Sequence, residues 1–245
     1  MLLWRRYLVS SLFEAIGTPL LYLLALGVGL GTLVDKGPHP LGGVGYVHYL
    51  APALLTAAAL QTAMTEGSYP TYARLKWTKV FFGVVATPIS PRQVADGQVL
   101  FIATRLTVGS ALYYLVILLF GAAGGPQGLL MIPVGVLLGV GCGAWVVALA
   151  GVMRSEGAGF VVVARFVILP MTLFSGTFFP ITELSPAIRW LAWISPLWHG
   201  NELARGAALG TLHWWPALGH LGFLIVLGVT GVMAARRTFA ARLVS

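Results

Sequence analysis

The chain has 245 residues, of which 58% are hydrophobic and only 9% are charged. A soluble domain carries about 25% charged residues, so this composition excludes a soluble enzyme and a disordered protein. The formal net charge is +8, and the single cysteine cannot form an intrachain disulfide. We therefore expect an all-α integral membrane protein that forms one domain over residues 1–245.

The first 14 residues precede the first long apolar segment. Arg6, Ser10 and Glu14 recur at four-residue spacing among Leu and Phe residues, which is typical of a short helix lying in the membrane interface. A continuation of the first spanning helix fits this short pattern nearly as well. The apolar run that follows is too long for a cleaved signal peptide.

Six apolar segments are candidates for transmembrane helices. Windows of about 20 residues with few charges match the roughly 30 Å hydrocarbon layer of a bilayer. The third and fourth segments are separated by Gly- and Pro-rich turn chemistry at residues 121–127. The expected spans cover residues 16–35, 46–65, 97–120, 128–152, 158–179 and 216–235.

The cytoplasmic connection between the second and third spans, residues 67–94, is longer than a turn. It is basic at Arg74, Lys76 and Lys79 and then apolar through Phe81 and Phe82. This order predicts a short amphipathic helix that ends before Thr87-Pro88. Ser90 then has the pattern of an N-cap, with Pro91 at the first helical position and Gln93 at the capping-box position. The segment is either a basic loop near anionic headgroups or a docking element for a cytoplasmic partner.

A second long connection, residues 180–215, lies on the opposite side. Ser185-Pro186 and Ser195-Pro196 predict two short helices, near residues 186–194 and 196–209, with Gly210 as a stop. Neither helix is long enough to span, and tryptophans crowd the region as they do at membrane boundaries. The two helices could form a re-entrant hairpin that caps a cavity, or they could lie flat on the surface.

The distribution of Lys and Arg predicts the orientation in a membrane. Basic residues mark the cytoplasmic side, so both termini are expected in the cytoplasm of a multi-pass chain in the cell (inner) membrane. We attribute the basic balance to topology and to contact with the lipid bilayer, and expect no nucleic acid as a partner. Ten cations fall on the cytoplasmic side: Arg5, Arg6, Arg74, Lys76, Lys79, Arg92, Arg154, Arg236, Arg237 and Arg242. Three fall opposite: Lys36, Arg189 and Arg205.

Charged residues inside or near the spans have two interpretations. Arg105 and Arg165 lie within spans, where a charge costs roughly 2.5–3.5 kcal/mol on insertion scales. Their long stems can reach the interface, which we prefer, or they can face an inner cavity and contact an anionic headgroup. Glu66 and Glu202 lie near helix ends and are expected to pair with a neighbouring Arg. No carboxylate is expected at the midplane, which argues against an ion-coupled carrier.

The sequence lacks the common catalytic and metal motifs. It contains no GxxxxGK[ST] phosphate loop, no HExxH, no GxSxG and no EF-hand loop. The histidines have no metal-ligand spacing. We therefore expect no catalytic residues, no metal site and no ATP hydrolysis by this chain.

Several motifs resemble one transporter family. ATPISPRQV at residues 86–94 follows the basic amphipathic stretch, and FSGTFFPITELSP at 174–186 leads into WISPLWHGNELAR at 193–205. With LAPAL at residues 50–54, they resemble type-2 ABC exporter permeases over nearly the whole chain, in the group that contains nodulation-factor and antibiotic-efflux permeases. The family frequently has Glu after Ser-Pro-Arg, where this chain has Gln93, so an ion pair there is in doubt.

The resemblance implies a six-helix permease that works as a homodimer, or as a pseudo-dimer with a related permease. Two copies of a separate ABC ATP-binding subunit would hold ATP and Mg, so this chain needs no cofactor. Residues 72–86 would form a coupling helix that docks in a cleft of the ATPase. The residues implied in coupling are Arg74, Lys76, Lys79, Phe81, Phe82, Thr87, Pro88, Ser90, Pro91 and Arg92. Those implied in the outer gate are Phe178, Phe179, Pro180, Trp190, Trp193, Pro196 and Trp198.

The expected function is the permease subunit of an ATP-driven exporter. It would move an amphipathic substrate, such as a drug, a lipid or a lipid-linked saccharide, out across the cell membrane. The alternatives are an ion-coupled secondary carrier, which would need ion-coupling residues, and a membrane scaffold or membrane enzyme, which would act without ATP.

Overall fold

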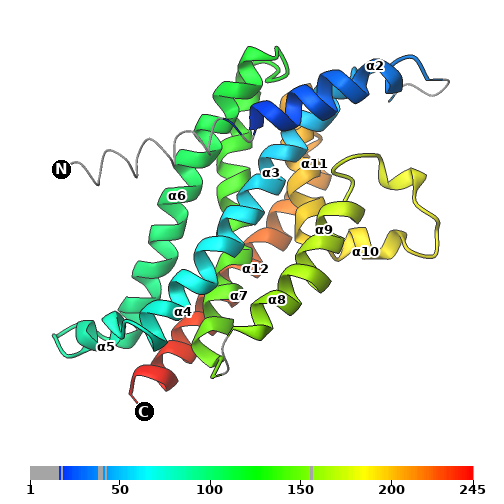
Figure 1. The fold of residues 1–245 in the computed structure, drawn as a ribbon. Coiled ribbons are helices and arrows are strands. Elements are labelled where there is room, and N and C mark those ends of the chain that lie inside the picture. The colour runs from blue at the N-terminus through cyan, green and yellow to red at the C-terminus, as the bar shows by residue number, and fades with distance from the viewer. Residues whose placement is uncertain (1–16, 18, 38–40, 42, 155–156, 245) are drawn as a thin grey trace.

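The computed structural model describes residues 17, 19–37, 41, 43–154 and 157–244, and all regular elements within these ranges are helices (Figure 1). The expectation of an all-α chain is confirmed for this part of the protein. The expected N-terminal interfacial helix, in residues 1–14, lies outside the described residues.

In the described part of the chain, three helices are long and apolar enough to cross a membrane. They are α6 (Pro91–Leu119), the run Pro126–Val152 and α12 (Trp214–Leu243). The run Pro126–Val152 joins η2 (Pro126–Leu130) to α7 (Met131–Val152). At 1.5 Å per residue, each extends about 40 Å, more than the roughly 30 Å hydrocarbon layer. These helices place the chain in a membrane.

The remaining apolar helices are shorter or less apolar. The segment Pro19–Val34 contains η1 (Leu23–Leu30) and α2 (Gly31–Val34), and η1 is a π-helix. α3 (Tyr46–Gly67) follows with Pro52 inside it. The backbone N–H of Tyr46 donates to the Asp35 carboxylate at 2.9 Å, which fastens the end of α2 to the start of α3.

The fifth apolar helix is assembled from three pieces, α8 (Ala158–Val163), the π-helical η3 (Ala164–Ile168) and α9 (Leu169–Phe174). The helix ends at Phe174, five residues before the end expected at residue 179. Gly176 adopts a left-handed φ of +72°, and the backbone leaves the helix at Ser175. Because side chains of α3 and α11 hold residues 175–177, as described below, tertiary contacts decide this end.

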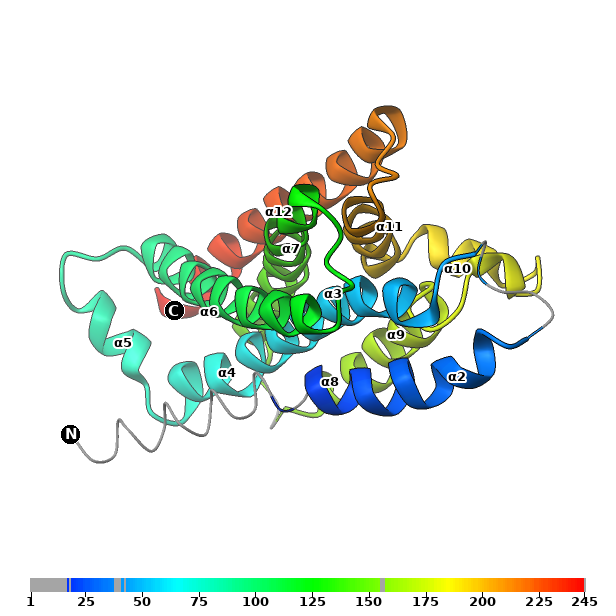
Figure 2. The ribbon, with the colours of Figure 1, turned by 90° about the horizontal axis from the view of Figure 1, so that it is seen from above.

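α7 lies at the centre of the bundle and packs against α12, α3 and α6 (Figure 2). Gly135, Gly139 and Gly143 form a row along α7 that lets α3 and α6 approach closely. A Cβ at Gly139 would lie 2.6 Å from Leu106 Cδ1, and one at Gly143 would lie 3.3 Å from Ala63 Cβ.

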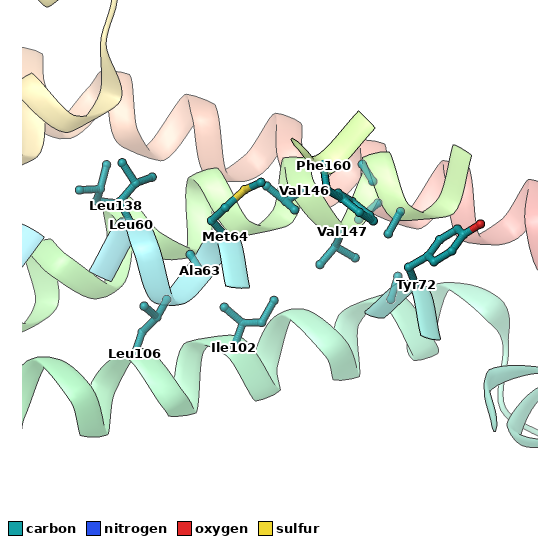
Figure 3. Packing of buried hydrophobic residues seen from close by; sticks show 14 of the residues in the cluster. Leu60, Ala63, Met64, Tyr72, Ile102, Leu106, Leu138, Val146, Val147 and Phe160 are labelled. Carbon is teal, nitrogen blue, oxygen red and sulfur yellow. The ribbon is translucent and has the colours of Figure 1, made fainter. Parts of the chain in front are cut away.

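The core is built where α3, α6 and α7 meet (Figure 3). Lipid tails are as apolar as these side chains, so close van der Waals packing rather than removal from water stabilises this part of the core. The labelled residues come from α3 (Leu60, Ala63 and Met64), α6 (Ile102 and Leu106) and α7 (Leu138, Val146 and Val147), with Tyr72 of α4 (Tyr69–Lys76) and Phe160 of α8 in the same cluster.

Two groups of short helices lie at opposite ends of the bundle (Figure 1). At one end, α4 (Tyr69–Lys76) and α5 (Val80–Val85) lie near the start of α6 and the C-terminal end of α12. We call this the α4–α5 end. Near the other end lie α10 (Arg189–Trp193) and α11 (Pro196–Leu209), which we call the α10–α11 end.

The segment expected as one amphipathic helix over residues 72–86 is broken in two. The N–H and the hydroxyl of Thr78 both bond to the Ala73 carbonyl, which closes α4. Lys79 then takes a left-handed conformation, φ +52°, and redirects the chain into α5. The single-helix expectation was therefore wrong, because a local hydrogen-bonded turn ends the first helix.

The start of α6 matches its sequence pattern. The Ser90 side chain accepts from the Gln93 N–H, and the Gln93 side chain accepts from the Ser90 N–H, so the capping box is complete. Pro91 occupies the first helical position, where its missing N–H costs nothing. The expected N-terminus is confirmed.

The helices at the α10–α11 end match their expected pattern in part. α11 begins at Pro196 and ends at Leu209, and Gly210 follows as its C-cap with a φ of +67°, as expected. The helix expected over residues 186–194 forms only from Arg189. The residue that precedes it is Ile188, and not Ser185 as expected. η4 (Ile181–Glu183) is a single 3-10 turn before it.

Candidate functional site

At the α4–α5 end, Arg74 points into the protein. Its Nη1 donates to Gln98 Oε1 at 2.7 Å, and its guanidinium lies 5.3 Å from the Phe101 ring centroid. Gln98 Nε2 in turn donates to the buried Thr71 hydroxyl at 2.9 Å. Arg74 therefore fastens α4 to α6. Its expected part in docking stays a prediction, and the structure gives it this packing role in addition.

Phe81 and Phe82 hold α5 against the bundle. Phe81 is buried, and its ring centroid lies 5.7 Å from that of Phe239 on α12. Phe82 is half-buried and packs against the same core. Of the expected coupling residues, these two and Arg74 are largely used in internal packing.

The exposed part of the expected coupling set follows α5. Thr87, Pro88 and Ser90 are exposed, as is Arg92 in the first turn of α6, while Pro91 is half-buried. Ile89 lies among them with 44% of its surface exposed. Lys79, also exposed, stands between α4 and α5, and Lys76 ends α4. This arrangement presents an apolar side chain flanked by cations, which can dock a complementary protein surface.

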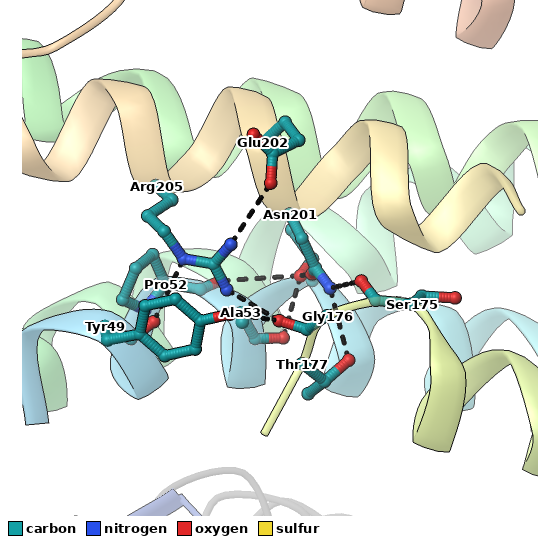
Figure 4. A network of polar contacts seen from close by, with 10 residues as sticks. Tyr49, Pro52, Ala53, Ser175, Gly176, Thr177, Asn201, Glu202 and Arg205 are labelled. Carbon is teal, nitrogen blue, oxygen red and sulfur yellow. Dashed lines mark hydrogen bonds and ion pairs between the residues drawn. The ribbon is translucent and has the colours of Figure 1, made fainter. Parts of the chain in front are cut away.

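At the α10–α11 end, Asn201 organises a buried polar cluster (Figure 4). Its Nδ2 donates to the Ser175 carbonyl at 2.9 Å and to Thr177 Oγ1 at 3.1 Å. Its Oδ1 accepts from the Thr56 hydroxyl at 2.5 Å. Asn201 is fully buried, so this single amide joins α11, α3 and the segment after α9.

Arg205 makes a second set of contacts one turn further along α11 (Figure 4). Its Nη2 donates to the Gly176 carbonyl at 2.8 Å, and its Nε donates to the Tyr49 carbonyl at 3.3 Å. The Tyr49 hydroxyl also donates to Gly176 O, at 3.0 Å. Glu202 completes the charge balance with an ion pair at 3.3 Å. Arg205 therefore has partners for its charge although its side chain is only 11% exposed.

Sequence reasoning missed the roles of Asn201, Arg205, Tyr49 and Tyr46. The Tyr46 hydroxyl donates to the Phe178 carbonyl at 3.1 Å, so it holds the same segment. The available signal was the presence of polar residues in motifs that are otherwise apolar. Arg205 was counted only as an outer charge, since its partner on α3, Tyr49, is 156 residues away in sequence.

The expected gate residues surround this cluster without forming one contact group. Trp190 and Trp193 on α10 are about half exposed, and Phe179 is 37% exposed. Phe178 and Pro180 are half-buried in the irregular segment before η4, and Pro196 opens α11. Trp198 is half-buried, and its Nε1 is a buried donor without a hydrogen-bond partner among the described residues.

Two histidines, one on α11 and one on α12, pair beside Trp198. Nδ1 of His199 lies 2.7 Å from Nδ1 of His220, and the His199 ring stacks on Phe223 with centroids 4.0 Å apart. Burial and the neighbouring His220 lower the pKa of His199, against a raising contribution from its bond to the Trp193 carbonyl. The lowered pKa favours the neutral form of His199.

Two acidic residues pair with arginine as expected. Glu66 near the end of α3 bonds Arg105 of α6 at 3.0 Å, and Glu202 bonds Arg205. Arg105 is 45% exposed and Glu66 16%. Arg165 on η3 is exposed. Among the described residues, no group of three or more His, Cys, Asp or Glu could hold a metal ion.

The sequence matches the ABC-2 type transporter family over residues 1–209. Nodulation protein J of Neorhizobium galegae is 27% identical over 232 residues, which cover 92% of this chain and 85% of that protein. Nodulation protein J of Rhizobium meliloti (strain 1021) is 25% identical over 210 residues, or 86% and 78% of the two chains. Nodulation protein J of Bradyrhizobium diazoefficiens is 25% identical over 242 residues, or 99% and 90%.

Proposed function

Because the chain belongs to the ABC-2 type transporter family, we propose that it is the permease subunit of an ATP-driven exporter. The observation that carries this proposal is the family match over residues 1–209, together with relatives that match along most of both chains. ATP and Mg would be bound by a separate ABC ATP-binding subunit, and this chain would bind neither.

The proposed topology has six spans in one domain, with both termini in the cytoplasm. Three long apolar helices and the shorter ones at Pro19–Val34 and Ala158–Phe174 support it, with α3 as the sixth. α4 and α5 would then lie at the cytoplasmic side, and α10 and α11 would enter the outer leaflet as a re-entrant hairpin. The concentration of Lys and Arg at the α4–α5 end supports this orientation.

We propose that the α4–α5 end docks the ATPase. The exposed surface from Thr87 to Arg92, with Ile89 at its centre, would contact the partner, and Lys76 and Lys79 would add charge complementarity. Arg74, Phe81 and Phe82 would transmit the contact, because they join α4 and α5 to α6 and α12. Closure of two ATPase subunits would in this way move the helices of a permease dimer.

We propose that the α10–α11 end forms the outer gate. The segment 175–180 would be the moving part, with Phe178, Phe179 and Pro180 on it and Trp190, Trp193, Pro196 and Trp198 beside it. The polar contacts from Tyr46, Tyr49, Asn201 and Arg205 to this segment support a gate that is locked by hydrogen bonds when closed. The substrate would be amphipathic, and the nodulation proteins among the relatives are consistent with a lipid-linked saccharide.

The test is purification of the tagged chain from its native membranes in mild detergent, followed by an ATPase assay. Recovery of a stoichiometric ATP-binding subunit with hydrolysis supports the exporter. A stable chain that never recovers such a subunit contradicts it and favours an ion-coupled carrier. Ile89→Asp with Arg92→Glu should abolish recovery, whereas Arg237→Glu, a change at an exposed cation on α12, should not.

A further inference from the structure

A cavity of about 420 Å³ opens at the α4–α5 end of the protein. Its size falls in the range of small-molecule sites, about 300–1,000 Å³. It lies between the end of α4, the turn into α5, the end of α7 and the end of α12. The lining residues are Leu75, Lys76, Lys79, Phe82, Arg154 and Arg242.

The charged residues that line this cavity in the described part of the chain are all cations. Lys76, Lys79, Arg154 and Arg242 come from four different segments, and the described lining residues include no carboxylate. The side chains of Lys79 and Arg154 form no ion pair and no hydrogen bond with any residue that the structure describes. Like charges gathered around one cavity repel each other, so a bound anion would stabilise the arrangement.

The backbone holds two of these cations in place. Lys76 Nζ donates to the Arg154 carbonyl at 3.3 Å, which ties the end of α4 to the segment after α7. Lys79 is the one residue other than glycine that has a positive φ in the described part of the chain. A left-handed conformation costs roughly 1–2 kcal/mol for a residue with a Cβ, and such strain is typical of functional sites.

The rest of the cavity and its surroundings are apolar. Leu75 and Phe82 form its non-polar wall. Trp77 and Val80, the neighbours of Lys76 and Lys79, are 58% and 51% exposed. Exposed Trp beside Lys and Arg is characteristic of the boundary between headgroups and acyl chains. The long apolar helices α7 and α12 also end here, at Val152 and Leu243.

We propose that this cavity binds the phosphate of an anionic phospholipid, with the start of an acyl chain against Leu75 and Phe82. The cations select a negatively charged headgroup, and the apolar wall selects a lipid over a free phosphate. Basic pockets between helices at the cytoplasmic side of a membrane suit such headgroups. The lipid would brace α4 and α5 against α7 and α12, and Lys76 and Lys79 would be shared between this cavity and the proposed ATPase-docking surface.

The test uses the full-length chain purified in a zwitterionic detergent and titrated with phosphatidylglycerol or phosphatidylcholine, with bound lipid counted by native mass spectrometry. Phosphatidylglycerol should bind and phosphatidylcholine should not. Arg154→Gln should weaken phosphatidylglycerol binding about fivefold, as expected for one cation near an anionic lipid. Arg154→Lys should retain binding, and Arg237→Gln, outside the cavity, should leave it unchanged.

Competition with inorganic phosphate distinguishes the sources of the anion. If phosphate at millimolar concentration displaces the lipid fully and binds equally well alone, the site is a phosphate site and the lipid proposal is overturned. Equal losses of phosphatidylglycerol binding in Arg154→Gln and Arg237→Gln would also overturn it, because they would indicate non-specific attraction between the protein's net charge and the lipid. Since Arg154 is not in the proposed ATPase-docking set, recovery of the ATPase with Arg154→Gln separates this proposal from the exporter assignment.

Discussion

The guanidinium of Arg205 lies over the ring of Tyr49, with 3.8 Å between Cζ and the ring centroid. The same guanidinium donates to the carbonyl oxygens of Tyr49 and Gly176. A flat cation that stacks on an aromatic ring and bonds two carbonyls cannot be replaced by the compact ammonium of lysine. This contact joins α11 to α3 and holds the turn at Gly176.

Arg205→Lys should therefore destabilise the protein and loosen segment 175–180. The ammonium of lysine cannot keep both carbonyl bonds and the stack on Tyr49, and losing one hydrogen bond to a charged group costs about 1.5–3 kcal/mol. The measurement is the midpoint of unfolding in detergent, with hydrogen exchange of residues 175–180. Lys36→Gln, an exposed cation elsewhere, serves as the control. An unchanged exchange rate in Arg205→Lys would contradict the assigned role.

Asn201 and Thr56 should be energetically coupled. Their side chains share a buried hydrogen bond between α11 and α3. We expect a coupling energy of about 0.5–3 kcal/mol in a double-mutant cycle of Thr56→Val and Asn201→Leu, because each change removes the other's partner. Additive effects of the two changes on the free energy of unfolding would show that the bond does not tie the helices together.

Removing Arg105 should lower the free energy of unfolding more than removing its ion-pair partner Glu66. Arg105→Gln leaves the largely buried Glu66 carboxylate unpaired, whereas Glu66→Gln leaves an arginine whose side chain is already 45% exposed. Arg105→Gln should therefore cost more, about 1 kcal/mol after solvent screening. The check is the unfolding midpoint of both variants and of the swap Glu66→Arg with Arg105→Glu. A swap no more stable than Arg105→Gln would argue against a specific pair.

Close contact between α12 and α7 depends on Gly231. A Cβ there would lie 2.9 Å from Trp145 Cδ1 and 3.1 Å from the Gly141 carbonyl. Gly231→Ala should destabilise the protein by about 1–3 kcal/mol through overpacking. Gly219→Ala is the matched control on the same helix, since no atom lies within 4 Å of the added Cβ. It should be neutral or stabilising by up to ~1 kcal/mol. Equal effects of the two changes would contradict this packing.

The paired histidines should make stability depend on pH. Burial lowers the pKa of His199 in the folded protein below its ordinary value of 6.5, so the unfolded chain binds more protons. The contribution of neutral His199 to the free energy of unfolding is therefore full above about pH 6.5, and it is lost as the pH falls through the histidine range. The unfolding midpoint measured from pH 8 to pH 5 should fall less in His199→Phe than in the unchanged protein. His213→Gln should retain the full dependence.

Local chemistry was sufficient for several elements. The Ser90, Pro91 and Gln93 pattern predicted the start of α6, because its capping bonds form within four residues. Gly210 predicted the end of α11 for a similar reason. The 72–86 helix and the end expected at residue 179 were wrong. Thr78 and Lys79 form a turn, and hydrophobic periodicity gives no signal for such a turn. Ser175 is held by Asn201 from another helix, which the local sequence does not indicate.

The sequence by itself determined that this protein resides in a membrane, that it is helical and that it resembles the ABC-2 type permeases. Composition, hydropathy and short motifs encode those properties, since each depends on neighbouring residues or on a simple average. Only the tertiary structure decided which polar groups meet. Thr56 and Asn201 are 145 residues apart, and the cations around the 420 Å³ cavity come from four separate segments. A buried polar group is stable only with its partner in place, and that partner is known only once the helices have packed.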